Sequence, residues 1–320
     1  MNRPRITGTG FMTIQHFYVG CDISKATIDF LDNSSGTHTR ITNTAAEILR
    51  FLKPYQNRSV CFAFEATGAY GMELQTCLAT AGIAPVQINP LHARRFAQSR
   101  GRLAKTDRID AAQLAEMATR YALPATHVFC QDTEELKALI VRRDQLVQQR
   151  AGEKKRLQQS RMEAVRHSLG KAIAQLSEEI STFEVLIQQA IRANPDFAAK
   201  SQLLQTIPGI GPAIAPVLIA MLREAGQTNR RAIAALAGIA PYNRDSGAMQ
   251  GHRSIAGGRH RIRRALYMAA LTAARSKSKL GVKYLSLREA GKPPKVALVA
   301  IARKIATIIN AILKTKKAYA

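Results

Sequence analysis

The first third of the chain alternates short apolar runs with amphipathic stretches. Strands are expected where apolar residues alternate or run together between turn-forming residues, and helices where they recur every three or four positions. The resulting order, a meander of strands followed by alternating strands and helices, is typical of a mixed α/β sheet with covered faces. The predicted strands are Ile14–Asp22, Ala26–Leu31, Thr37–Asn43, Ser59–Glu65 and Ala84–Ile88, and the predicted helices are Ala45–Leu52, Met72–Ala81 and Asp107–Tyr121.

The middle of the chain is a polar helical stretch, from about Thr133 to Ala193, with an apolar seam at spacings of three and four. Such a seam is typical of an antiparallel helical hairpin or coiled coil. Gly170 is the expected bend, and the favoured interpretation of this segment is a linker or dimerisation element without chemistry. The remaining residues are predicted to form an all-α region with glycine-rich turns. The expected domains are therefore 13–128, 129–200 and 201–320.

Charge separates the last part of the chain from the rest. The formal net charge is +25, and residues 201–320 hold 21 basic against 3 acidic side chains, a balance of +18. A field of this size favours a polyanionic partner, which we expect to be nucleic acid. No membrane association is expected, because apolar runs such as Val296–Ala302 are shorter than the ~20 residues of a span. The first residues lack the apolar core of a signal peptide, so a cytoplasmic protein that joins the bacterial nucleoid when it acts is predicted.

Two acidic residues lie at the ends of predicted strands, and two more lie on one face of a predicted helix. Asp22 and Glu65 each lie at the carboxyl end of an apolar strand, and Asp107 and Asp110 lie three residues apart. If the strands are neighbours and the helix crosses their ends, the four carboxylates converge. Such a cluster resists ionisation without a cation, and its oxygen ligands suit Mg²⁺, two ions of which assist phosphoryl transfer. Taken singly, each acid has a structural explanation as a turn or helix cap.

Four segments resemble the DEDD transposases of the insertion-sequence one-ten family, which are relatives of the Piv DNA invertase. These segments are GCDIS (20–24), FEATGAYG (64–71), NPLHARRFA (89–97) and KTDRIDAAQLAE (105–116). The resemblance implies an RNase H-like N-terminal domain similar to that of the RuvC junction resolvase. It also implies that the Mg²⁺-binding acidic tetrad consists of Asp22, Glu65, Asp107 and Asp110.

The basic part of the chain holds a candidate serine and a glycine turn. GIAPYNRDSG (238–247) followed by RRALYM (263–268) is similar to the family's transposase domain. This similarity implies that Ser246 attacks DNA phosphate to form a covalent phosphoserine, for which its hydroxyl needs a base or a metal. The turn TIPGIGP (206–212) resembles a helix-hairpin-helix element, in which the backbone N–H groups of Gly209 and Gly211 face a phosphate. The arginines expected to contact nucleic acid are Arg244, Arg253, Arg259, Arg263 and Arg264.

The predicted function is a transposase that cleaves and rejoins DNA strands to move an insertion sequence. The resemblance implies donor and target DNA as substrates and a structured bridge RNA as a partner. The long middle helices and a reaction on two duplexes predict a dimer or tetramer. Two alternatives remain open: a RuvC-like junction resolvase that hydrolyses DNA with the tetrad alone, and a basic architectural DNA-binding protein. The first keeps its cleavage when Ser246 is replaced, and the second has no Mg²⁺-dependent nicking.

Overall fold

The chain folds into two compact units, Met1–Cys130 and Gln131–Ala320, in a computed structural model. The structure describes residues 17–66, 68–101, 106–126, 130–243, 251 and 253–319. Each unit has hydrophobic clusters of its own. The predicted division into three domains stays a prediction, but the middle helices share a core with the C-terminal helices, as shown below by their buried side chains.

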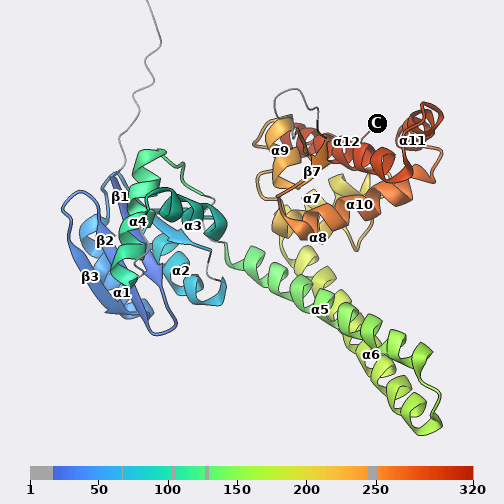
Figure 1. The fold of residues 1–320 in the computed structure, drawn as a ribbon, viewed down its shortest axis with the longest axis horizontal. Helices are drawn as coiled ribbons and strands as arrows, with labels where there is room; N and C mark the ends of the chain where they lie inside the picture. Colours follow the sequence, from blue (N-terminus) through green and yellow to red (C-terminus); the bar gives the residue numbers. More distant parts are fainter. Residues whose placement is uncertain are drawn as a thin grey trace, which may run out of the picture. The chain divides into compact units, whose positions relative to one another are not determined.

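The first unit is built on a five-stranded sheet in the order β3-β2-β1-β4-β5 (Figure 1). β2 pairs antiparallel with both β1 and β3, whereas β1, β4 and β5 run parallel. This arrangement confirms the mixed sheet, with its meander first and its crossovers afterwards. The strands are β1 (Phe17–Ile23), β2 (Thr27–Asp32), β3 (His38–Thr42), β4 (Val60–Glu65) and β5 (Ala84–Ile88). Residues 14–16 of the predicted first strand lie outside the described residues.

Helices cover both faces of this sheet, as the alternation of side chains requires. On one face Val19 and Phe62 pack in a cluster with Leu52 of α1 and Leu78 of α2. On the other face the opposite residues of the same strands pack against α3 and α4. The helices of this unit are α1 (Ala45–Leu52), α2 (Met72–Thr80), α3 (Pro90–Ser99) and α4 (Asp107–Arg120), with the short 3₁₀ segments Lys53–Tyr55 and Gly68–Gly71.

The helix α3 was not predicted, although its start has a clear local signal. The side chain of Asn89 accepts a hydrogen bond of 2.9 Å from the N–H of Leu91, and Pro90 occupies the first helical position. An Asn cap followed by Pro is a favoured helix start, because Pro lacks the N–H that would otherwise be unsatisfied. The apolar content of α3 is too low for its periodicity to stand out.

The second unit begins with the expected helical hairpin, made of α5 (Gln131–Gln159) and α6 (Glu163–Ala193). The predicted bend at Gly170 is wrong, because α6 continues through this residue. The chain turns at residues 160–162 instead. There the guanidinium of Arg166 donates to the carbonyls of Leu157 and Ser160 at 3.1 and 3.0 Å, which satisfies acceptors at the end of α5.

The base of the hairpin packs into the core of the C-terminal helices. Leu136 and Ile187 belong to the same buried cluster as Leu218 and Ile305. Two short paired strands also occur here, so the expectation of an all-α region is corrected in this detail. The elements that follow the hairpin are α7 (Pro195–Gln205), α8 (Ala215–Met221), α9 (Arg230–Leu236), β6 (Pro241–Tyr242), β7 (Ser254–Ile255), α10 (His260–Ala274), α11 (Lys279–Glu289) and α12 (Pro294–Thr315).

Among the described helices, α12 alone is long and apolar enough to cross a membrane by length and composition. It has 22 residues and a mean hydropathy of 1.9, so the run Val296–Ala302 underestimates its apolar length. Half of this segment is buried inside the unit, where Ile301, Ile305 and Ile309 are at most 1% exposed. Burial of this extent is typical of a core helix.

Candidate metal centre and nucleic-acid interface

A row of charged side chains crosses four adjacent strands of the sheet. Arg40 of β3 pairs with Asp29 of β2, and Asp29 pairs with Asp22 of β1. In the parallel pair, Cys21 lies opposite Phe64, so the next position places Asp22 beside Glu65 of β4. Residues opposite one another in neighbouring strands point to the same face of a sheet. The four side chains therefore share the face that α3 and α4 cover.

The first turn of α4 lies over this row because Gly20 allows a very close approach. A Cβ atom at Gly20 would overlap the carbonyl oxygen of Ala111 and lie 2.7 Å from the amide nitrogen of Ala115. Gly20 and Asp22 are two residues apart on β1 and point to the same face. Asp107, one turn before Ala111, and Asp110, immediately before it, are thus carried towards Asp22.

Electrostatics show that the acids are gathered around Asp22. Burial, followed by the charges of Asp110, Asp107, Asp29 and Glu65 in this order, raises the pKa of Asp22 to about 6. Like charges disfavour ionisation only when they lie close together, because the interaction falls off with distance and screening. The structure thus brings together all four acids that the sequence singled out, and it adds Asp29 as a fifth.

Asp29 is the member of the cluster that sequence reasoning missed. Its residue is only 2% exposed, and its carboxylate accepts from His38 Nε2 at 2.7 Å and from Arg40 Nε at 2.9 and 3.0 Å. A second nitrogen of Arg40, Nη2, reaches Oδ2 of Asp107 at 2.6 Å. In the sequence Asp29 stands between the apolar residues Ile28 and Phe30, and this alternation is typical of a strand whose polar side chains face solvent. Only the strand register reveals that it faces Asp22.

The residues present fit a divalent cation in donor type and charge. The cluster offers hard carboxylate oxygens, which Mg²⁺ prefers, and it contains more negative charge than Arg40 and His38 can offset. No group of three or more His, Cys, Asp or Glu side chains within the described residues is arranged to hold an ion as it stands. The side chain of Asp107 is 60% exposed at the start of α4, so this acid lies on the solvent side of the cluster, where Arg40 holds it.

Gly20 supplies a direct test of this arrangement. Replacing Gly20 by Ala is expected to push α4 away from β1, to lower the free energy of unfolding by about 1–3 kcal/mol and to impair any activity of the acid cluster. Gly152 is a matched control, because it lies inside α5 with nothing within 4 Å of an added Cβ. Urea unfolding followed by circular dichroism measures both variants. Equal stability of the Gly20→Ala variant and the unaltered protein would contradict the proposed close packing.

The candidate nucleophile falls between two described strands, β6 and β7. Ser246 and Arg244 are themselves outside the described residues. The chain leaves β6 and returns in β7, which pair antiparallel through Pro241 with Ile255 and Tyr242 with Ser254. Beneath this ladder Gly238 and Gly258, both with positive φ, touch so closely that a Cβ on Gly258 would overlap the backbone nitrogen of Gly238. The two glycines therefore allow the segments that carry β6 and β7 to approach closely.

The four described arginines of the predicted interface differ in how they are held. Arg259 pairs with Glu224 and donates to the carbonyl of Met221 at 2.8 Å. Arg263 donates to the carbonyl of Gly257. These two arginines fix the start of α10 and the glycine-rich segment before it. Arg253 and Arg264 are exposed and have no ion pair among the described residues. They are the better candidates for contact with phosphate.

The glycine turn between α7 and α8 uses its two glycines differently. Gly209 has a φ of +92°, and a Cβ there would overlap the carbonyl oxygen of Ala269 in α10. Its role is to allow the turn to pack against this helix. Gly211 has nothing within 4 Å of an added Cβ, so its surroundings are open. Gly211 is thus the position at which another molecule has room to approach.

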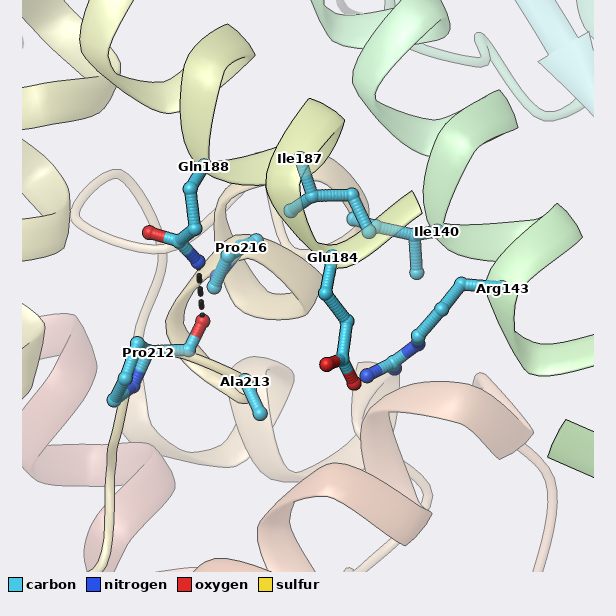
Figure 2. Close-up of a pocket in the computed structure, with 8 residues that line it drawn as sticks. All are labelled: Ile140, Arg143, Glu184, Ile187, Gln188, Pro212, Ala213 and Pro216. Atoms are coloured by element: carbon cyan, nitrogen blue, oxygen red, sulfur yellow. Dashed lines mark hydrogen bonds between the residues drawn. The ribbon is translucent and has the colours of Figure 1, made fainter. Parts of the chain in front are cut away.

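A hydrogen bond from the hairpin fixes this turn. The side-chain Nε2 of Gln188 in α6 donates to the carbonyl of Pro212 at 2.9 Å, as Figure 2 shows. The bond borders a half-open cavity of about 220 Å³. In Figure 2 the charged ends of Glu184 and Arg143 reach the same side of this cavity. The hydrogen bond beside the cavity holds the turn in place. None of the predicted site residues lines the cavity. Its lining consists of Ile140, Arg143, Glu184, Ile187, Gln188, Pro212, Ala213 and Pro216.

Comparison with known proteins places both units in one family. Residues 19–161 match the IS110 DEDD family described as "Transposase", and residues 201–285 match the "Transposase IS116/IS110/IS902 family". The pilin gene-inverting proteins of Moraxella lacunata and Moraxella bovis are each 27% identical over 313 residues, or 94% of this chain and 97% of theirs. A 44.8 kDa uncharacterized protein of the insertion element IS116 from Streptomyces clavuligerus is 28% identical over 154 residues. This match covers 47% of the chain and 37% of that protein.

An acid cluster on a mixed sheet, followed by a strongly basic helical unit, is the architecture of an enzyme that acts on DNA. Together with these relatives it defines the protein as a DNA transposase or recombinase. The chain belongs to the IS110 family of DEDD transposases. The alternative of an architectural protein without chemistry is thereby set aside.

Proposed function

We propose that this protein cleaves and rejoins DNA strands in a Mg²⁺-dependent reaction that moves an insertion sequence. The observation that carries the proposal is the row from Glu65 to Asp29 beneath the first turn of α4. The matched proteins are named for gene inversion in one case and for insertion elements in the other. Both kinds of rearrangement require strands to be cut and joined again, and transposition is the one that we assign to this chain.

The four acids of the predicted tetrad would hold the metal, and their negative charge is balanced by a pair of divalent ions. Mg²⁺ bound to Asp22, Glu65, Asp107 and Asp110 supplies Lewis acidity that stabilises charge on the attacked phosphate and on the leaving oxygen. The residues of this chain contribute the anionic ligands and their placement. The strand order and directions support an RNase H-like fold for this unit.

Ser246 is the proposed nucleophile. Its Oγ loses its proton and forms a bond to the phosphorus of the scissile phosphodiester, the bond to one DNA oxygen breaks, and that oxygen takes up a proton, so that no proton is gained or lost overall. The covalent phosphoserine is itself a phosphodiester, so its bond is similar in energy to the DNA bond that was broken. A hydroxyl of another DNA strand then attacks the phosphoserine, joins to the phosphorus and releases Ser246. No external energy source is needed, because one phosphodiester replaces another.

The basic second unit is proposed to bind nucleic acid by its phosphates. Arg244, Arg253 and Arg264 would contact the backbone directly, and the open side of Gly211 would accommodate a phosphate. Arg259, Arg263 and Gly209 would support this surface from beneath. We further propose a bridge RNA that selects donor and target DNA, and a dimer or tetramer that holds two duplexes. The proposed location is the cytoplasm, at the nucleoid during the reaction.

The test of the proposed function is a paired substitution of two glutamates. Replacing Glu65 by Gln is expected to reduce Mg²⁺-dependent strand cleavage about a thousandfold, since a metal ligand is worth several kcal/mol in the transition state. Glu73→Gln is the control, because Glu73 is an exposed residue of α2. The substrate is a plasmid carrying the DNA that flanks the gene for this chain, together with RNA transcribed from it. Cleavage that survives in Glu65→Gln would refute the proposal.

A further inference from the structure

Arg40 joins two acids of the cluster that belong to different elements. Its Nε lies 2.9 and 3.0 Å from the two carboxylate oxygens of Asp29 on β2, and its Nη2 lies 2.6 Å from Oδ2 of Asp107 on α4. The bridge therefore links the sheet to the first turn of the helix. It leaves the other oxygen, Oδ1, of Asp107 without a bond from Arg40.

The position of Arg40 follows from the sheet. It lies directly opposite Asp29 in the antiparallel pair of β2 and β3. His38, two residues before Arg40, points to the same face and contacts Asp29 as well, at 2.7 Å. Side chains that start from adjacent strands have little freedom to separate, so the contact between Arg40 and Asp29 is built into the strand register.

The cluster needs such a cation. Asp29 is 2% exposed, and a buried carboxylate without a positive partner is strongly unfavourable. Asp22, Glu65, Asp107 and Asp110 add four more acids nearby. Asp29 is held by both Arg40 and His38, and Asp107 is held by Arg40. An arginine is suited to this place because its planar group donates to two carboxylates at once.

We propose that Arg40 is the resident counter-ion of the acid cluster and a positioning residue for Asp107. Its charge offsets the carboxylates before a divalent ion binds, and its bridge from Asp29 to Asp107 fixes the carboxylate of Asp107 against the sheet. The inference rests on the proposed function of these acids as metal ligands. It predicts that Arg40 lowers the affinity for metal by its charge and raises the rate of cleavage by its geometry.

Two substitutions separate these effects. Arg40→Gln removes the charge and the bridge, whereas Arg40→Lys keeps the charge but has one nitrogen that cannot bond both carboxylates in the same way. Arg50→Gln is the matched control, because Arg50 pairs with Glu47 on the surface of α1 and its side chain is 74% exposed. Each variant is examined as the full chain.

The first measurement is Mn²⁺ binding, followed through the electron paramagnetic resonance signal of the free ion. We expect Arg40→Gln to bind Mn²⁺ roughly tenfold more tightly, because one repelling charge is lost from the cluster, and Arg40→Lys to stay within about twofold of the unaltered protein. Arg50→Gln should bind Mn²⁺ as the unaltered protein does. Equal or weaker Mn²⁺ binding by Arg40→Gln would overturn the assignment of Arg40 as a counter-ion.

The second measurement is the rate of DNA cleavage at saturating Mg²⁺. Both Arg40 variants should be slower by about a hundredfold, since a small misplacement of a catalytic group has this effect. Wild-type rates in both variants would overturn the positioning role. Asp22→Asn separates this inference from the proposed function. If Asp22→Asn binds Mn²⁺ like the unaltered protein, the metal centre itself is wrong, whatever the Arg40 variants do.

Discussion

Replacing Asp22 by Asn is expected to abolish strand cleavage and, at the same time, to stabilise the metal-free protein at pH 7. The loss of cleavage should be at least about a thousandfold, because Asp22 is at the centre of the proposed metal ligands. The gain in stability has a separate cause. Burial and four neighbouring acids raise the pKa of Asp22 to about 6, so at pH 7 the folded protein holds this carboxylate in its less favourable, charged form.

The pH dependence fixes the sign of this effect. The ordinary pKa of an aspartate is about 3.9, so between roughly pH 4 and pH 6 the folded state binds more protons at Asp22 than the unfolded state. The stability that Asp22 contributes is fully present below about pH 4, and it is lost as the pH rises through 6. After allowance for partial exposure, the unfavourable contribution at pH 7 is about 1–2 kcal/mol.

Urea unfolding in the presence of a chelator measures this contribution. Asp22→Asn should be more stable than the unaltered protein at pH 7, and the difference should shrink as the pH falls from 6 to 4. Asp32→Asn is a useful comparison, because hydrogen bonds from Ser34 and Tyr55 lower the pKa of Asp32 and reverse the sign. A metal-free Asp22→Asn variant that is less stable at pH 7 would contradict the acid crowding.

Replacing Ser246 by Ala is the second change with a large expected effect. If Ser246 forms the covalent bond to DNA, the variant should lose both the protein–DNA adduct and cleavage, by about a thousandfold or more, since no other group can take its place as nucleophile. Labelled DNA that remains attached to protein in a denaturing gel reports the adduct. Ser254→Ala, in β7, is the control and should keep both activities.

The alternative of hydrolysis by the acids alone predicts a different pattern. In that case Ser246→Ala still cleaves DNA, no adduct forms in any variant, and Asp22→Asn is inactive. This outcome would assign the protein a resolvase-like reaction and would remove Ser246 from the mechanism, while leaving the proposed metal centre intact.

Much of the first unit could be predicted because its signals are local. The strand that ends in Glu65 follows from a continuous apolar run, and the helix that begins at Asp107 follows from apolar residues at helical spacing. The structure adds the Thr106 cap, whose Oγ1 accepts from the N–H of Ile109 at 3.3 Å. The predicted convergence of the tetrad required that the two strands be neighbours and that the helix cross their ends. It did not require a known register.

Other features depend on contacts that local patterns cannot show. Asp29 is an ordinary polar position in an alternating strand until its register with Asp22 and Arg40 is known. The hairpin turns at residues 160–162, where Arg166 caps carbonyls at the end of α5, and Gly170, the predicted bend, lies only eight residues further on, inside α6. Gly209 was expected to present its backbone to a phosphate. In the structure the absence of a side chain at Gly209 instead allows the backbone of Ala269 to pack closely against it. A glycine in a sequence does not tell which neighbour it accommodates.

The central claim, that the carboxylates on β1, β4 and α4 form a divalent-metal centre, is tested most directly by titrating the purified chain with Mn²⁺ at neutral pH. The unaltered protein should bind the ion at a site that disappears when Asp22 is replaced by Asn and that persists when the remote Glu73 is replaced by Gln. Identical binding curves for all three proteins would show that the ion is held elsewhere or not at all.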